Sequence, residues 1–379
     1  MKFTIDKHWL NEAIGHVSKA ISSRTTIPIL SGIKFDVRHD GITLTASDTD
    51  ISIQRFIPVE HEGHIIVQVE QTGSLVIPAK FFVDLVRKLP SAQVLIERKE
   101  MYQILIRSGN SEVLLAGLDA EEYPVLPSLE ENQIITLNND LLKSMIRQTV
   151  FAASSNEATS VLTGVLWTLH DSTLKFVATD RHRLASMEVR LESTPVQFTN
   201  IVISAKTLNE LYKLLSDQNQ KIDIVVADNQ VLFKIDSLLF FTRILDGTYP
   251  DTTKIIPQVY KSEIVFQTKE LADAIDRAYL MSREEKTNIV RMSAADDGEI
   301  EISSSSTEIG KVTEQLVAKI VTGEPLKIAF NSKYMLDVLK VIDSETIRIG
   351  FTGAMSPMIV KPDEHTQILH LILPYRTTG

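Results

Sequence analysis

Residues 77–90 read IPAKFFVDLVRKLP, and this stretch recurs twice in altered form. The second copy, ISAKTLNELYKLLS, begins at Ile203, and the third, FNSKYMLDVLKVID, begins at Phe330. In the second copy, Leu208, Leu211 and Leu215 fall on one helical face, which predicts an amphipathic helix in each copy. Three helices at nearly equal spacing predict one domain repeated three times.

Other segments recur in the same register. Strand-like runs open at Phe3, Ile135 and Ile264, and a second helix follows each run, with apolar positions at Leu10, Leu142 and Leu271 and at Ile14, Ile146 and Ile275. Segments that alternate apolar and polar residues follow the first set of helices and predict hairpins: VLIERKEMYQILI from Val94, IDIVVADNQVLFKI from Ile222 and TIRIGFTGAMSPMIV from Thr346. We therefore predict an α+β fold of three domains, residues 1–128, 129–256 and 257–379.

A polar turn also recurs. FVATDRHRLA at 176–185 matches LTASDTDISI from Leu44, and ISSSSTEIGKV from Ile302 is a weaker third copy. Four polar or charged residues, 180–183, follow an apolar strand and precede Leu184, as expected for the wall of a ligand pocket. The alternative interpretation is a solvated turn without function.

Composition limits the class of protein. The chain has 379 residues, 44% of them hydrophobic, and no cysteine, which excludes disulfides and thiolate metal sites. The first residues and the absence of a long apolar run predict a cytoplasmic protein without a membrane segment. The net charge of -10 argues against a surface that is basic all over, although a local basic face is compatible with it.

Basic residues recur at matching repeat positions. The aligned residues are Lys80, Lys206 and Lys333, then Arg87, Lys213 and Lys340; Arg24, Lys143 and Arg147 are further candidates. Each could be a solvated residue in a pair such as Lys206 with Glu210. Their recurrence favours a polyanion bound along a curved or closed array of domains.

SSRTTIPIL (22–30), the ATD and HRLA pieces within 178–185, LDGTYPD from Leu245 and LILPYR (371–376) together resemble the β subunit of bacterial DNA polymerase III, the sliding clamp family. The resemblance covers the whole chain. It implies a head-to-tail homodimer that forms a ring around duplex DNA, with helices lining the hole. It implies no catalysis, no cofactor and no reading of base sequence. On this basis Arg24, Lys80, Lys206, Lys213, Lys333 and Lys340 are the expected DNA-binding residues.

The resemblance also implies a hydrophobic cleft that binds peptide tails. The expected partners are the polymerase III alpha subunit, the delta subunit of the clamp loader, and mismatch-repair and translesion factors. The expected cleft residues are Leu162, Thr179, His182, Arg183, Leu184, Pro250, Ile255, Leu371, Leu373, Pro374 and Arg376. Leucines and Ile255 would hold a leucine or phenylalanine anchor, while His182 and Arg183 would bind peptide carbonyls or a glutamine side chain.

Two further expectations follow from the resemblance. Val113 and Leu115 would meet Leu280 and Met281 across the dimer interface, and all four could instead be core residues. Arg181 and Tyr375 stand where the family usually has smaller side chains, so the peptide preference stays open.

Two other functions are compatible with parts of the sequence. Asp180 and His182 could form an acid–base or metal pair, although no catalytic motif accompanies them. A monomeric scaffold that binds peptides but not DNA would explain the cleft and leave the repeated lysines without a role.

Overall fold

The structure is a computed structural model that describes residues 1–22, 25–126, 129–130, 133–216, 220–284, 287–295, 299–364 and 367–376. It consists of two compact units. The first contains Met1–Asp140 and Lys213–Ile244, and the second contains Leu141–Tyr212 and Leu245–Gly379. The middle third of the chain therefore contributes to both units.

Six α-helices occur at the predicted positions. The three lysine-bearing copies form α2 (Ala79–Lys88), α4 (Ala205–Leu214) and α6 (Ser332–Leu339). The second predicted set forms α1 (Lys7–Val17), α3 (Asn139–Thr149) and α5 (Thr268–Glu284). All six aligned apolar positions of the second set are 0–1% exposed, which confirms the predicted helical face.

The first unit contains two antiparallel sheets. The five-stranded sheet has the order β11 (Ser111–Ala116), β10 (Gln103–Ser108), β9 (Gln93–Arg98), β1 (Lys2–Asp6) and β7 (Val67–Gln71). The eight-stranded sheet has the order β12 (Ile134–Asn138), β17 (Lys221–Val226), β18 (Gln230–Ile235), β19 (Leu238–Arg243), β4 (Ile51–Pro58), β3 (Gly41–Ser47), β2 (Gly32–Arg38) and β8 (Gly73–Pro78). A short hairpin, β5 (Glu60–His61) with β6 (His64–Ile65), completes the strands described in this unit.

The second unit also contains two antiparallel sheets. The nine-stranded sheet has the order β16 (Phe198–Ser204), β13 (Gly164–His170), β14 (Thr173–Thr179), β15 (Arg183–Arg190), β28 (Ile368–Ile372), β27 (Met358–Pro362), β26 (Thr346–Phe351), β20 (Ser262–Gln267) and β24 (Ile320–Gly323). The four-stranded sheet has the order β23 (Gly310–Val317), β22 (Glu299–Ser306), β21 (Ile289–Ala294) and β25 (Leu326–Asn331). The three predicted hairpins, β9–β10, β17–β18 and β26–β27, are confirmed.

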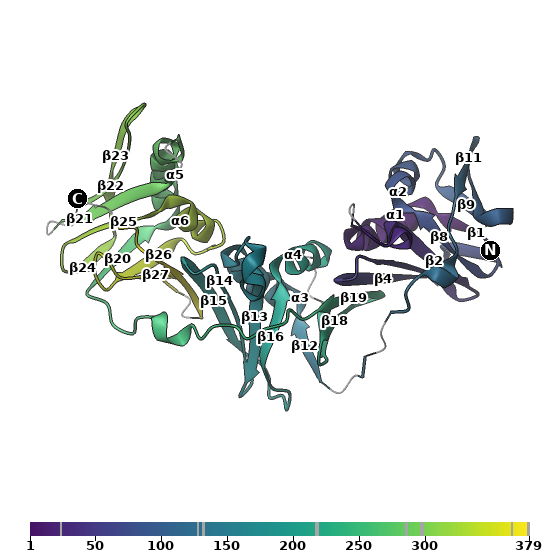
Figure 1. Cartoon of the computed structure of the whole chain (residues 1–379), viewed down its shortest axis with the longest axis horizontal. Helices are drawn as coiled ribbons and strands as arrows, with labels where there is room; N and C mark the ends of the chain where they lie inside the picture. Colours follow the sequence, from purple (N-terminus) through teal and green to yellow (C-terminus); the bar gives the residue numbers. More distant parts are fainter. Residues whose placement is uncertain are drawn as a thin grey trace. The chain divides into compact units, whose positions relative to one another are not determined.

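Helices pack in pairs against these sheets. Figure 1 shows α1 beside α2 in the first unit and α5 beside α6 in the second, each pair in mutual contact. The core beneath α5 and α6 contains Phe266, Leu271, Phe330 and Met335, all at most 1% exposed. Short 3-10 helices connect the elements: η1 (Ser18–Ala20), η2 (Pro28–Ser31), η3 (Glu100–Tyr102), η4 (Ala120–Glu122), η5 (Val150–Ala152), η6 (Glu157–Thr163) and η7 (Thr253–Ile255).

Candidate functional site

The predicted pocket wall at 180–183 is a tight turn between β14 and β15, built by one carboxylate. Asp180 Oδ1 accepts hydrogen bonds from the backbone N–H groups of His182, at 2.9 Å, and Arg183, at 3.0 Å. Thr179 Oγ1 donates to the Arg183 carbonyl at 2.6 Å. The turn holds Arg181 at a φ of 78°, a left-handed conformation that is uncommon for any residue other than glycine.

The same turn occurs between β3 and β4. Asp48 Oδ1 accepts from the N–H groups of Asp50 and Ile51, and Thr49 has a φ of 81°. Asp48 therefore corresponds to Asp180, as the sequence alignment predicted. The turn recurs with different side chains at its tip, so the aspartate serves to hold the backbone of the turn through these hydrogen bonds. The residues at the tip can therefore differ in role between the two turns.

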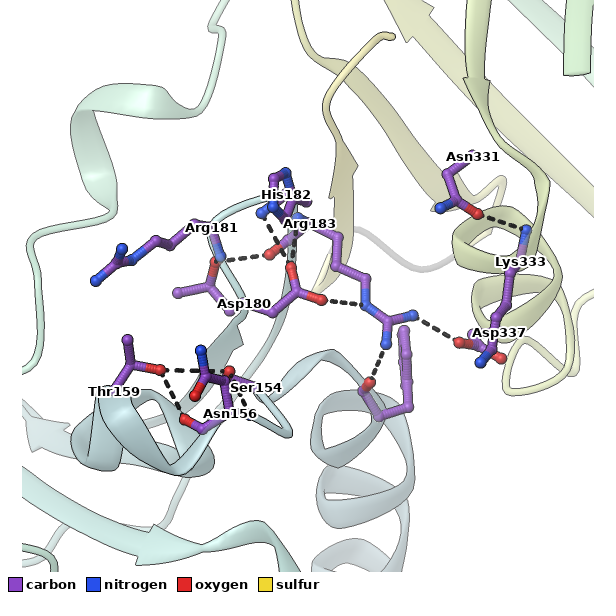
Figure 2. Close-up of polar contacts among 12 residues, drawn as sticks. Ser154, Asn156, Thr159, Asp180, Arg181, His182, Arg183, Asn331, Lys333 and Asp337 are labelled. Atoms are coloured by element: carbon purple, nitrogen blue, oxygen red, sulfur yellow. Dashed lines mark hydrogen bonds and ion pairs between the residues drawn. The ribbon is translucent and has the colours of Figure 1, made fainter. Parts of the chain in front are cut away.

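Arg183 is fixed by three internal partners within the second unit. Its Nε bonds Asp180 Oδ2 at 3.0 Å, its Nη1 bonds Asp337 Oδ2 at 2.6 Å, and its Nη2 donates to the Phe151 carbonyl at 2.7 Å. The guanidinium also lies 4.5 Å from the centre of the Tyr334 ring. Figure 2 shows how these contacts join the turn to α6 and η5. The side chain is only 11% exposed, so its primary role in this structure is to link these elements.

An apolar pocket of about 600 Å³ lies on one side of the turn. We define the apolar pocket by residues 158–162, 246–247 and 250–252 together with Thr179, Arg181 and Ile255. Leu162 is 4% exposed, whereas Ile255 is 46% exposed at the rim. The pocket is therefore apolar at its base and open to a ligand at its rim.

A buried cluster supports this pocket from below. Leu184 and Leu371 face each other across the β15–β28 pairing, and each is 1% exposed. The hydroxyl of Tyr249 accepts a hydrogen bond from the Thr179 N–H at 3.0 Å, and burial raises the pKa of this hydroxyl. These contacts fix the strand end that carries the turn.

A polar pocket of about 620 Å³ adjoins the apolar pocket. We define the polar pocket by residues 151, 153–156, 159, 180–183, 333–334 and 337. Thr159 and Arg181 line both pockets and so mark their common border. The ring of His182 stacks near that of Tyr334, with centroids 6.5 Å apart.

The predicted cleft residues thus gather in one region of the second unit. Leu162, Thr179, Pro250 and Ile255 line the apolar pocket, and His182 and Arg183 line the polar pocket. The final strand brings its end beside the turn, because Leu373 N–H donates to the His182 carbonyl at 2.9 Å. Pro374 forms a β-bridge with Phe330, and Arg376, the last described residue, is exposed. Sequence reasoning missed Tyr249, Tyr334, Phe151 and Asp337 as supports of this region, although Tyr249 lies within the quoted LDGTYPD motif.

Comparisons with known proteins show the family of the chain. Three family models match the chain in succession: the DNA polymerase III beta subunit N-terminal domain at residues 1–127, the central domain at 136–251 and the C-terminal domain at 253–376. The beta sliding clamp of Bacillus subtilis is 52% identical over the full length of both chains. The chain belongs to the DNA polymerase III beta subunit family. Members of this family, the beta sliding clamps, encircle duplex DNA and tether DNA polymerase as processivity factors.

Solved sliding clamps have the same fold. The crystal structure of the Bacillus subtilis clamp matches with a TM-score of 0.97 and 51% identity, covering 100% of this chain and 99% of that one. The DNA polymerase III beta chain of Streptococcus pneumoniae matches with a TM-score of 0.96 and 36% identity, covering 99% and 100%. The predicted family and the predicted threefold clamp-type α+β fold are therefore confirmed.

The DNA-binding residues expected of a sliding clamp lie on helices where the structure describes them. Lys80, Lys206 and Lys333 are each exposed at the second position of α2, α4 and α6. Lys213 is in the last turn of α4, and Lys340 is the C-cap of α6. Arg24 lies outside the described residues. Arg147, a further candidate, is engaged in a bidentate pair with Asp343 at 2.7 and 2.9 Å.

The expected interface residues lie at the surface of their domains. Val113 and Leu115 are half-buried on β11, which is the edge strand of the five-stranded sheet. Leu280 is 47% exposed near the end of α5, and Met281 follows it.

The described residues contain neither a membrane-spanning helix nor a metal-binding cluster. Among the described residues, none of the helices combines the length and apolar character that a membrane span requires. Within the same residues, no group of three or more histidine or acidic side chains could hold a metal ion.

Proposed function

We propose that this chain performs the role of its family, encircling duplex DNA and tethering DNA polymerase, as a head-to-tail homodimer. Each copy would supply three clamp domains, residues 1–128, 129–256 and 257–379. The successive family matches and the threefold repetition of helices and hairpins support this division. Binding to DNA would be directed to the backbone and independent of base sequence.

The proposed DNA-binding face is supported by the positions of the three aligned lysines, Lys80, Lys206 and Lys333. A lysine in the first turn lies at the positive end of the helix dipole, which costs about 0.3–1 kcal/mol of helix stability. The same disfavoured placement in α2, α4 and α6 therefore calls for an advantage outside the helix itself. A phosphate group would be attracted both by the lysine and by the N-terminal N–H groups.

Two edge strands support the dimer. Among the described strands, β11 has β10 as its only sheet neighbour, and β23 has only β22. Each edge presents unpaired backbone groups and exposed apolar side chains, such as Leu114 at 56% and Val317 at 86%. Pairing of β11 with β23 of a second copy would satisfy both edges and bring Val113 and Leu115 toward Leu280 and Met281.

The apolar and polar pockets would dock the peptide tails of partner proteins. A leucine or phenylalanine would enter the apolar pocket, and the remaining peptide would lie along the turn 180–183 and the end of β28. The partners proposed by the resemblance are the polymerase III alpha subunit, the clamp loader delta subunit, and mismatch-repair and translesion factors. Removal of residues 374–379 should therefore abolish peptide binding without unfolding the protein or splitting the dimer.

A topological experiment tests the proposal. The protein is loaded on a nicked circular plasmid with the clamp loader of a related bacterium, and the DNA-bound fraction is measured by gel filtration before and after the plasmid is linearised. The wild type should remain on the circle and leave the linear DNA. Substitution of Lys80, Lys206 and Lys333 by glutamate should reduce the loaded fraction severalfold, because three phosphate contacts become repulsive.

A charge-matched variant controls for the change in net charge. Glutamate at Lys99, Lys221 and Lys327, three exposed lysines outside the helices, should leave loading close to the wild-type value. Equal retention on circular and linear DNA would refute encirclement and favour the monomeric peptide-binding scaffold. Wild-type loading of the helix variant would place the DNA elsewhere.

A further inference from the structure

Arg181 and Arg183 are two residues apart and have opposite environments. The guanidinium of Arg183 has three hydrogen-bond partners, whereas that of Arg181 has none among the described residues and is exposed. Figure 2 shows the Arg181 side chain extending away from Arg183 and Asp337. The backbone N–H of Arg181 donates a hydrogen bond to Thr179 Oγ1 at 3.2 Å, so the turn fixes the position of the Arg181 backbone.

The backbone of the turn accounts for this direction. Arg181 has a φ of 78°, and its counterpart Thr49 has a φ of 81° in the corresponding turn. The left-handed conformation is therefore imposed by the turn and is not caused by the arginine. This conformation is unfavourable for a side chain other than glycine. An arginine held there without an internal partner is available to a ligand.

Charge is distributed unevenly across the two pockets. The polar pocket contains three basic side chains, Arg181, Arg183 and Lys333, against two carboxylates, and both carboxylates are bound to Arg183. The apolar pocket has its carboxylates, Asp246 and Asp251, on residues that do not line the polar pocket. Asp251 is already bound to the N–H and hydroxyl of Thr253. Positive charge without a partner is thus found at the border and in the polar pocket.

We propose that Arg181 is a specificity-determining residue that selects partner peptides with an acidic residue close to their apolar anchor. With the anchor in the apolar pocket, the neighbouring residues of the peptide pass the border that Arg181 and Thr159 form. A carboxylate there forms a charge-assisted hydrogen bond with the free guanidinium. Asp246 and Asp251 line the apolar pocket but not the polar pocket, and their carboxylates repel an acid placed beside them, so the same charges also favour one direction of the bound peptide. This inference rests on the proposed peptide-docking function of the two pockets.

Labelled pentapeptides test this selectivity by fluorescence anisotropy. Each ends in Leu-Phe and carries one aspartate at the first, second or third position, with glutamine and alanine at the others; in a matched peptide, asparagine replaces the aspartate. At one or more positions the aspartate peptide should bind wild-type protein about three- to fivefold more tightly than its asparagine match, as expected for an exposed ion pair. The difference should shrink when NaCl is raised from about 0.1 M to about 0.5 M, because the electrostatic screening length becomes about twofold shorter.

Three variants separate the contribution of Arg181 from that of the pocket. Arg181→Gln should abolish the preference for aspartate while the asparagine peptides bind as before, and Arg181→Glu should reverse it. Arg38→Gln, at an exposed arginine in the first unit, should behave as wild type. If the peptides bind but aspartate and asparagine are equivalent at every position, or if Arg181→Gln retains the preference, the inference is wrong and the docking function stands. If none of the peptides binds, the docking function itself fails.

Discussion

Arg183 is the residue whose role differs most from the expectation based on sequence. The sequence resemblance predicted that Arg183 binds a partner peptide, and this contact stays a prediction. In the structure its guanidinium links the β14–β15 turn to α6 and η5 through Asp180, Asp337 and the Phe151 carbonyl. Asp337 is 154 residues away in the chain. No local spacing rule reveals such a pair, because only tertiary packing brings the two side chains together.

The first prediction compares the two neighbouring arginines by stability. Arg183→Met should lower the free energy of unfolding by about 2–3 kcal/mol, because it leaves two partly buried carboxylates without their cation. Arg181→Met should change it by less than about 0.5 kcal/mol, since that side chain is exposed and has no internal partner. Urea denaturation followed by circular dichroism measures both.

The double variant Arg183→Met with Asp337→Asn gives a further check on the cause. It should recover part of the lost stability, because one of the stranded charges is removed. Equal stability of the two single variants would show that the contacts of Arg183 are not what holds the turn on α6.

At the scale of elements, the local structure was largely predictable. The helices and hairpins follow from hydrophobic periodicity and from repetition, and the matching registers confirmed each other across the three copies. The pairings of β4 with β19 and of β15 with β28 were not predictable in this way. They join strands from different repeats, and the pattern of one strand does not specify which distant edge it will meet. For the same reason the predicted cleft residues could be named from resemblance, while their supporting residues could not.

β28 carries a fully buried histidine, His370. His370 pairs with Ala185 and Val360 on the two neighbouring strands and is 0% exposed. Neither ring nitrogen has a hydrogen-bond partner in the described part of the chain. Burial alone lowers the pKa of His370 to about 3.

The second prediction follows from that pKa. Below a pH of about 6.5 the unfolded chain binds a proton at this histidine, whereas the folded chain does not bind it until the pH approaches 3. Stability should therefore fall as the pH decreases through this window. Between pH 7 and pH 5, wild-type protein should lose about 2 kcal/mol more of its unfolding free energy than His370→Leu, measured by urea denaturation. Parallel pH profiles for the two proteins would show that His370 contributes no such linkage.

At the scale of the whole molecule, the acidic net charge and the basic helices have complementary consequences. A chain with a net charge of -10 repels DNA in general, so the proposed DNA binding is restricted to the helix faces on which the lysines recur. Weak local attraction is compatible with sliding when the protein is retained by its topology and not by affinity. The closed ring is therefore the property on which the proposed function depends most.

The third prediction concerns closure through the apolar end of α5. In solution the protein should have a mass near twice 42.5 kDa, measured by X-ray scattering on an absolute scale. Leu280→Glu should give particles near 42.5 kDa, because it places a charge on an apolar surface that the proposed dimer covers. Its circular dichroism spectrum should match that of the wild type, since Leu280 is 47% exposed within the chain.

A matched variant tests whether the site of the charge matters. Ile65 is 65% exposed on β6, which pairs with β5 and with neither of the proposed interface strands, and Ile65→Glu should keep the dimer mass. A wild-type mass near 42.5 kDa at micromolar concentration would contradict the dimer and leave the exposed edges of β11 and β23 without a partner. Dissociation by both variants would instead indicate that the dimer is sensitive to any added charge, and the interface would have to be sought on another surface.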